Sequence, residues 1–259
     1  MGVFMINRII SVFFLGYICI TCLLMFVGAL IIWLLTVGFD KQLKILHLYT
    51  SFWASIYIWT MPAWSLTIKG KSYIDNKKTY IVTSNHQSLL DILVAFRLFF
   101  HFKWVSKVEI FKIPLVGWNM YLNQYIPLVR GDKNSVQKMF DDCNKSILQG
   151  NSIYMFPEGT RSKTRELKAF KSGAFVIAKK NNIPILPIAI SGTREALPRN
   201  SLNFHGKKTI IVTVLPEIPV EIVENLSVDE LSHLVRCRIS EQVIQNYAII
   251  DGNKESKSQ

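Results

Sequence analysis

The 259-residue sequence has no charged side chain in one long segment near its start. Positions 9–39 contain neither acidic nor basic residues, and the first acidic residue of the chain is Asp40. A bilayer core about 30 Å thick is crossed by about 20 helical residues, so this segment is long enough to enter lipid. The apolar region of a cleaved signal peptide is shorter, about 7 to 15 residues, and ends in small residues. We therefore expect a membrane segment rather than a cleaved leader.

A second stretch, residues 45–68, lacks Asp, Glu, Lys and Arg and is rich in the Trp and Tyr residues typical of a membrane interface. Pro62 is expected to end or kink a helix there. Two arrangements fit: a single membrane span, or a two-helix hairpin that enters the bilayer and returns. We favour the hairpin, because Arg8 and the lysines from Lys69 onward then share one face, which their positive charge marks as cytoplasmic. Residues 1–68 are thus expected to form a membrane-embedded helical segment.

Cysteine and histidine are both scarce, with four and five residues respectively. Cys19 and Cys22 have C-x-x-C spacing, but they lie in the apolar segment, whereas a redox or metal pair needs polar, accessible thiolates. Cys143 and Cys237 are isolated, which indicates a reducing compartment without a disulfide framework. The histidines have no ligand spacing, so no zinc or other metal site is expected.

Positive charge is in excess, with 30 Lys and Arg against 18 Asp and Glu. This excess suits an anionic bilayer surface, a phosphorylated substrate or an acidic carrier protein. A nucleic-acid partner would bring aromatic–basic repeats, zinc spacing or a recognition helix, and the sequence has none of these. The charge therefore favours a lipid or phosphate partner and argues against nucleic acid.

Residues 69–250 alternate short β-rich runs with amphipathic helical runs. This alternation predicts an α/β fold with a largely parallel mixed sheet flanked by helices. The expected strands are Tyr80–Thr83, Lys103–Ser106, Tyr125–Val129, Ile153–Phe156, Ile185–Ile190 and Thr209–Leu215. The expected helices are Leu89–Phe100, Ser135–Leu148, Ala169–Lys180 and Ser227–Ile249, the last of which starts with a capping box. The polar tail, residues 251–259, is expected to be disordered.

The run SNHQSLLD places His86 and Asp91 after one of these strands. Five residues at 100° each would set the two side chains about 140° apart on one helix, so we expect His86 before the helix and Asp91 in its first turns. The carboxylate can then bind one ring nitrogen and leave the other as a base near neutral pH. Two alternatives stay open: a helix cap without chemistry, and Ser84 or Ser88 as a nucleophile, although neither serine lies in a G-x-S-x-G elbow.

Two other strand ends carry candidate binding groups. In FPEGTR, Gly159 lets backbone approach a ligand, Arg161 offers a planar fork for phosphate and Glu158 can accept a hydrogen bond from a hydroxyl. In YIPLVRGD, Arg130 stands at the carboxyl end of a strand, where open α/β sheets bind ligands. A charged surface turn is the alternative interpretation of the first run, because loops are normally polar.

The blocks NHQSLLD, IPLVRGD, FPEGTRS and ILPIAI, in this order, resemble those of the glycerolipid acyltransferase family, most closely the bacterial 1-acylglycerol-3-phosphate acyltransferases. The match runs from about Gly70 to Leu215. The resemblance implies an α/β domain on an amino-terminal two-helix membrane segment. Residues 69–250 are therefore expected to form the catalytic domain, on the face that the positive charge marks as cytoplasmic. The resemblance implies no cofactor; acyl-CoA or acyl-carrier protein would be the acyl donor. The residues before Arg130 depart from the commonest family pattern, which bears on acceptor preference.

Roles for individual residues also follow from the resemblance. It implies that His86 is the catalytic base and Asp91 its orienting partner, acting on the sn-2 hydroxyl of lysophosphatidate to give phosphatidic acid. The implied substrate-binding residues are Lys107, Arg130, Glu158, Gly159, Thr160 and Arg161. The basic members would hold the acceptor's phosphate, and Glu158 and Gly159 would help to hold its glycerol part. Three rivals are kept: another lysolipid as acceptor, a lipid hydrolase using the same pair, and a lipid binder without activity.

Overall fold

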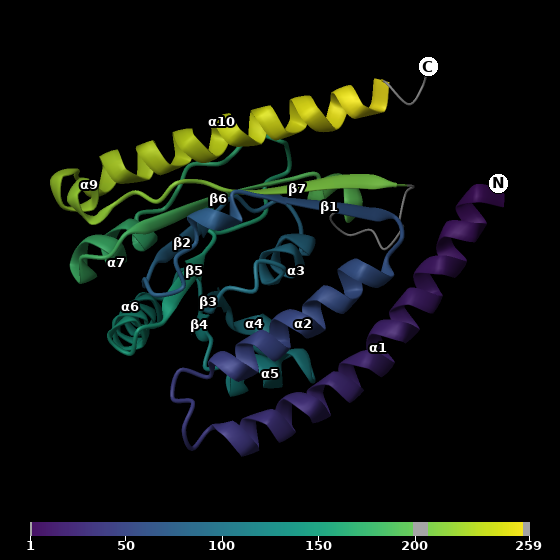
Figure 1. Cartoon of the computed structure of the whole chain (residues 1–259), viewed down its shortest axis with the longest axis horizontal. Helices are drawn as coiled ribbons and strands as arrows, with labels where there is room; N and C mark the ends of the chain where they lie inside the picture. Colours follow the sequence, from purple (N-terminus) through teal and green to yellow (C-terminus); the bar gives the residue numbers. More distant parts are fainter. Residues whose placement is uncertain (1, 199–206, 256–259) are drawn as a thin grey trace.

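A seven-stranded sheet organises the computed structural model, which describes residues 2–198 and 207–255. The strands are β1 (Trp64–Lys69), β2 (Ile81–Ser84), β3 (Phe102–Lys107), β4 (Ile126–Leu128), β5 (Ser152–Met155), β6 (Ile185–Ser191) and β7 (Lys208–Val214). Their order is β1-β7-β6-β2-β5-β3-β4, and every neighbouring pair is parallel except β6 and β7 (Figure 1). The predicted α/β fold with a largely parallel mixed sheet is confirmed.

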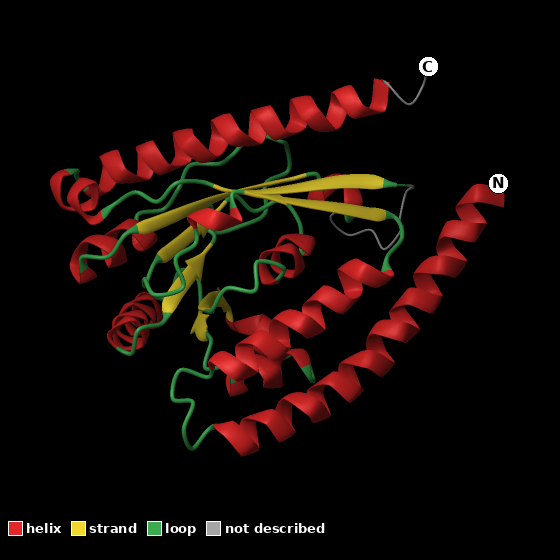
Figure 2. Cartoon of the chain, viewed as in Figure 1, coloured by secondary structure: helices red, strands yellow, loops and turns green. Residues whose placement is uncertain are grey.

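Helices cover both faces of this sheet. They are α1 (Gly2–Thr36), α2 (Lys44–Thr60), the 3-10 helix η1 (Lys71–Tyr73), α3 (Leu90–Phe96), α4 (Val108–Phe111), α5 (Val116–Leu122), α6 (Lys133–Leu148), α7 (Gly173–Asn181), α8 (Thr193–Ala196), α9 (Val220–Asn225) and α10 (Val228–Glu255). Figure 2 shows α10 along one side of the strands and α3, α2 and α1 in succession on the other. This layering gives the chain two cores, one on each face.

Successive strand residues supply these two cores in turn, because side chains along a strand point to opposite faces. Val82 and Leu186 pack with residues of α2 and α3 in one core, whereas Ile81 and Ile185 pack with α6, α7 and α10 in the other. Every residue of β6 is buried. The unbroken apolar run ILPIAI is therefore explained by burial on both faces.

Helix α1 is the one helix, within the described residues, that is long and apolar enough to cross a membrane. The span Val12–Thr36 has a mean hydropathy of 2.8, and only 11% of its most apolar window is buried. This apolar helix indicates membrane association. Helix α2 returns alongside α1 in the opposite direction, so the two form the expected hairpin (Figure 1). Unlike α1, α2 buries one side against α3 and the core.

Residues 64–68, expected in the membrane segment, belong instead to β1. Trp64, Leu66 and Ile68 alternate with polar residues, which is the period of a strand, and each residue of β1 pairs in register with β7. Both a sheet strand and a membrane helix can lack charge, so composition alone did not separate them. The expected domain boundary after residue 68 falls inside this strand, and the helical segment ends at Thr60.

Most other elements follow the sequence expectation, although α3 ends at Phe96 instead of Phe100 and α7 begins at Gly173 instead of Ala169. All six expected strands are present, with ends shifted by at most one residue. The capping box is also present, since the Ser227 N–H donates to the Glu230 carboxylate and the Glu230 N–H donates to the Ser227 hydroxyl. Helix α10 continues to Glu255, so the first five residues of the expected disordered tail are helical. Residues 256–259 lie outside the described part of the chain.

A buried lysine ties the helical hairpin to the sheet. Lys103 on β3 is 2% exposed, and its ammonium donates to the carbonyl oxygens of Gln42, in the turn between α1 and α2, and of Asn123, each at 2.8 Å. Burial lowers the pKa of Lys103 to about 8. The charged form is thus held in the interior by carbonyl dipoles rather than by a carboxylate within salt-bridge distance.

Candidate active site

His86 and Asp91 meet at the carboxyl end of β2, where the chain passes into α3. The His86 ring nitrogen Nδ1 lies 2.8 Å from Asp91 Oδ2, with His86 in the loop and Asp91 in the first turn of α3. The loop begins at Asn85, whose side chain bonds the backbone N–H and C=O of Ile190 on β6, both at 2.8 Å. The contact expected from the sequence is therefore present, and the sheet anchors the residue before it.

Asp91 is fully buried and receives four hydrogen bonds. Its Oδ2 atom accepts from the backbone N–H groups of Gln87 and Ser88 at 2.6 and 2.8 Å, in addition to His86, and its Oδ1 atom accepts from the Thr193 hydroxyl. A carboxylate held by donors only accepts, so the proton between His86 and Asp91 belongs on Nδ1. That tautomer leaves Nε2 of His86 as a free base.

Glu158 holds the backbone of the loop that carries His86. One carboxylate oxygen accepts from the His86 N–H at 2.7 Å and the other from the Lys168 N–H at 3.0 Å. Glu158 is 4% exposed, and burial raises the pKa of its carboxyl group. The His86 carbonyl in turn accepts from the Ser162 N–H at 2.7 Å. The loop after β5 thus holds the histidine from both sides, and each Glu158 oxygen already accepts one backbone N–H.

Five of the expected binding residues line one cavity of about 430 Å³ together with His86. These are Lys107, Arg130, Gly159, Thr160 and Arg161. They come from the carboxyl ends of β3, β4 and β5, which lie next to each other in the sheet. Because carboxyl ends of parallel strands share one edge, residues far apart in sequence converge here. The Lys107 ammonium is 2.8 Å from Glu109, so part of its charge is already balanced.

The rest of the cavity is mostly apolar. It is lined by Leu89, Ile92, Phe96, Trp104, Val105, Ile110, Val116, Met120, Tyr125, Leu128, Met155 and Phe156, with Thr50, Ser106 and Asn119 as further polar residues. The His86 ring stacks on Phe156 with centroids 4.0 Å apart and planes inclined by 17°. One cavity therefore joins a base, a cluster of cations and an apolar compartment.

Neither candidate nucleophilic serine lines this cavity. The buried Ser84 hydroxyl accepts from Tyr154 at 2.9 Å, and the Ser88 hydroxyl donates to the Leu197 carbonyl at 2.7 Å and accepts from the Leu90 N–H. Both serine hydroxyls thus have structural partners other than His86. The serine-nucleophile interpretation finds no support in the geometry.

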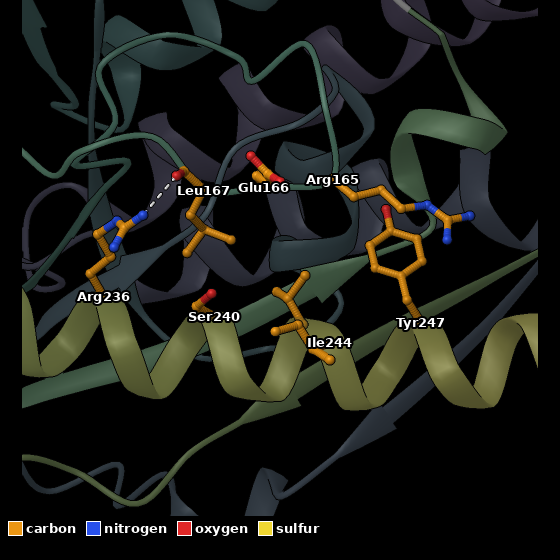
Figure 3. A pocket seen from close by; sticks show the side chains of 8 residues that line it. Arg165, Glu166, Leu167, Arg236, Ser240, Ile244 and Tyr247 are labelled. Atoms are coloured by element: carbon orange, nitrogen blue, oxygen red, sulfur yellow. Dashed lines mark hydrogen bonds between the residues drawn. The ribbon is translucent and has the colours of Figure 1, made fainter.

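A second cavity, of about 420 Å³, lies between the loop after FPEGTR and helix α10 (Figure 3). Arg165 pairs with Glu195 and Asp251 and stacks on the Tyr247 ring, 4.0 Å from its centroid. Arg236 donates to the Leu167 carbonyl at 3.1 Å. Both arginines already bind protein groups. Their contacts hold the loop against α10, and we therefore do not interpret this cavity as a second anion site.

Two partners of the site carried no readable signal in the sequence. Thr193 follows the fourth block and reaches Asp91, and Tyr247 on α10 donates to the Gln87 side chain at 2.9 Å. Both lie more than 100 residues from His86 in the chain, and a lone Thr or Tyr has no motif spacing. Only the fold brings them together. Within the described residues, no three metal-ligating side chains cluster together.

The sequence is similar to those of known acyltransferases. The acyltransferase family model matches residues 65–191. The chloroplastic 1-acyl-sn-glycerol-3-phosphate acyltransferase BAT2 of Brassica napus is 39% identical over 179 residues, covering 67% of this chain and 51% of the relative. The 1-acyl-sn-glycerol-3-phosphate acyltransferase of Saccharomyces cerevisiae is 34% identical over 167 residues, covering 62% and 54%. The chain thus spans about half the length of these relatives.

A solved structure shares the whole fold. The crystal structure of the 1-acyl-sn-glycerophosphate (LPA) acyltransferase PlsC from Thermotoga maritima matches with a TM-score of 0.78 over 94% of this chain and 97% of that one, at 21% identity. At that identity the match shows a common fold, including the amino-terminal helices. The matched family model and the curated relatives show that the chain belongs to the acyltransferase family.

Proposed function

We propose that this protein is a 1-acylglycerol-3-phosphate O-acyltransferase, which moves a fatty acyl group from a thioester donor to the sn-2 hydroxyl of lysophosphatidate. The observation that carries the proposal is the single cavity in which His86, the basic residues and an apolar compartment meet. The named activity of the curated relatives supports the same reaction. A lysolipid with a phosphate at one end and a chain at the other matches both parts of the cavity.

In the proposed mechanism, His86 Nε2 removes the proton of the sn-2 hydroxyl while that oxygen attacks the thioester carbonyl. Asp91 stabilises the imidazolium that forms, because its carboxylate faces Nδ1 at 2.8 Å. The tetrahedral intermediate collapses with release of the thiolate, which takes the proton back from Nε2. General-base assistance of this kind contributes about 10² to 10⁴-fold in rate, and positioning supplies much of the rest.

Arg130, Arg161 and Lys107 are proposed to hold the acceptor's phosphate. A guanidinium binds phosphate through two parallel hydrogen bonds, which fix direction as well as distance. Thr160 and the backbone at Gly159 lie beside them on the cavity wall. A Cβ at Gly159, whose φ is +69°, would lie 3.0 Å from the Lys171 side chain, so a larger residue would crowd this wall.

The acyl donor is proposed to be acyl-CoA or acyl-carrier protein arriving from the cytoplasm, with the helical hairpin in the facing leaflet. Exposed apolar side chains near the cavity support this orientation, since Leu89 and Val116 line the cavity and are 49% and 38% exposed. Trp118 of α5 is half exposed and packs edge-on against Phe26 of α1, with centroids 5.5 Å apart. The apolar surface of α1 thus continues beside the cavity, which suits an acceptor that diffuses in the bilayer.

The experiment that tests the proposal is product analysis with purified protein, lysophosphatidate and a donor labelled in its acyl chain. Transfer predicts label in a two-chain phosphatidic acid. Release of labelled free acid alone would instead indicate a hydrolase, and binding of lysophosphatidate without any labelled product would indicate a silent lipid binder. Replacing lysophosphatidate by other lysolipids in the same assay identifies the acceptor, and CoA against carrier-protein donors identifies the carrier.

A further inference from the structure

A threonine outside the four sequence blocks contacts the buried carboxylate of the site. Thr193 is the first residue of α8, is fully buried, and donates its hydroxyl hydrogen to Asp91 Oδ1. It follows Gly192, whose φ of +86° lets the chain turn sharply from β6 into α8. A Cβ on Gly192 would lie 2.1 Å from the Thr209 carbonyl, so the turn requires glycine. The backbone therefore aims Thr193 at the carboxylate.

The four hydrogen bonds on Asp91 divide into two groups. Three reach Oδ2, and all come from the segment 86–88 just before the helix. The fourth reaches Oδ1 and comes from Thr193, more than 100 residues away. Among the described residues, Thr193 is the only partner of Oδ1. Its hydroxyl therefore opposes rotation of the carboxylate, which would turn Oδ2 away from His86.

Helix α8 is itself held firmly, so Thr193 has a fixed position. The Tyr247 hydroxyl on α10 accepts from the Gly192 N–H at 3.3 Å and lies 2.9 Å from the Gln87 side-chain oxygen. At the other end of α8, the Leu197 carbonyl accepts from the Ser88 hydroxyl at 2.7 Å. Contacts on both sides of Thr193 thus join α8 to the segment that carries His86.

We propose that Thr193 is a positioning residue for acyl transfer, which holds the Asp91 carboxylate in the orientation that keeps His86 ready to accept a proton. Thr193 does not line the cavity and acts through Asp91. The proposal rests on the proposed acyltransferase function and adds to it the residue that fixes its carboxylate. A serine at this position would keep the hydrogen bond, whereas a valine would keep the shape and lose it.

The test compares Thr193→Val with Thr193→Ser in steady-state acyl transfer to lysophosphatidate. Loss of a hydrogen bond to a charged group predicts that kcat falls about 10- to 100-fold in Thr193→Val, with KM for both substrates unchanged. Thr193→Ser should retain most of the wild-type kcat. Unchanged kcat in Thr193→Val would overturn the proposal, and so would an equal loss in the serine variant.

Thr83→Val is the matched control. Thr83 is a fully buried threonine on β2, two residues before Asn85, and its hydroxyl has no partner among the described residues. The same change of OH to CH₃ at another fully buried threonine is therefore expected to leave kcat unchanged. If Thr83→Val lost as much kcat as Thr193→Val, the loss would reflect a general effect of changing a buried threonine, and the positioning role would be refuted.

A double variant tests whether Thr193 acts through Asp91. In an Asp91→Ala background the acceptor of the Thr193 hydroxyl is gone, so adding Thr193→Val should reduce kcat no further. An additional tenfold loss in that background would show that Thr193 acts independently of Asp91. Wild-type transfer activity is the reference for every variant: its absence would refute the proposed function, whereas a fully active Thr193→Val variant would refute only the positioning role.

Discussion

The proposed base and the proposed phosphate-binding residues share one cavity but differ in burial and in hydrogen bonding. The His86–Asp91 pair is buried, with the His86 side chain 12% exposed and Asp91 not at all, and every polar atom of the carboxylate has a partner. The proposed phosphate-binding residues Lys107, Arg130 and Arg161, here called the basic rim, are more open to solvent. The side chain of Lys107 is 42% exposed, and Arg130 is also exposed. The side chains of Arg130 and Arg161 make no hydrogen bond or ion pair to any described residue.

This difference matches what each part must do. A base that receives a proton in the transition state gains from an orientation fixed before substrate arrives. A phosphate clamp has to admit a charged lipid, and arginines whose donors are not used by the protein can offer all of them to the ligand. We therefore expect substitutions in the buried pair to change kcat and substitutions in the rim to change KM.

The largest effect is expected at the buried pair. His86→Ala removes the proton acceptor, so kcat for transfer should fall about 10² to 10⁴-fold while lysophosphatidate binding is retained. Steady-state kinetics and a vesicle-free lipid-binding assay measure the two quantities. His233→Ala is the matched control, because His233 is exposed on α10 outside the cavity and should leave kcat unchanged. Near-normal kcat in His86→Ala would contradict the proposed role of His86 as the base.

A smaller effect, on a different kinetic constant, is expected at the rim. Arg161→Ala removes a charge-assisted contact to phosphate, so KM for lysophosphatidate should rise about 10- to 100-fold with a much smaller change in kcat. Arg161→Lys should recover only part of the affinity, since an ammonium cannot bind phosphate through a planar fork. Lys163→Ala, at an exposed position on the same loop, controls for general loss of charge. A loss of kcat without a rise in KM in Arg161→Ala would contradict the expectation that the basic rim determines KM.

The third effect is on stability rather than on catalysis, and it tests whether burial lowers the pKa of Lys103. Burial lowers the pKa of Lys103 to about 8, from 10.5 in the unfolded chain. Between these values the unfolded chain keeps a proton that the native state has released, so native stability rises with pH. The gain is on the order of 3 kcal/mol in total. Thermal unfolding in detergent from pH 7 to 10 should show that the stability of the wild type rises relative to that of Lys103→Met. A stability difference that does not change with pH would contradict the lowered pKa.

The sequence was sufficient for most of the fold. Continuous or alternating apolar runs marked six strands to within one residue, because burial in a parallel sheet leaves a strong signal. Strand β1 was missed because its uncharged residues adjoin an apolar helix, although Trp64, Leu66 and Ile68 alternate with polar residues. The short helices α4, α5, α8 and α9 were also missed. A helix of four to seven residues has too few turns to show a period.

The site was predictable where residues belong to one short segment. His86 and Asp91 lie five residues apart, so helix geometry alone indicated their contact. Convergence of Arg130 and Arg161 was expected because both follow strands of one sheet. Glu158 shows the limit of such reasoning: residue type suggested a ligand contact, but the sequence did not indicate that both oxygens accept backbone N–H groups. Thr193 was beyond reach, since its partner depends on how α8 packs.

The most direct test of the account compares kcat/KM for lysophosphatidate with kcat/KM for a monoacylglycerol of the same chain length, using one labelled acyl donor. The two acceptors differ only in the phosphate that the basic rim is proposed to bind. Two charge-assisted contacts predict a preference of about 100-fold or more for the phosphorylated acceptor. Equal use of both acceptors, or labelled free acid as the only product from either, would contradict the central claim.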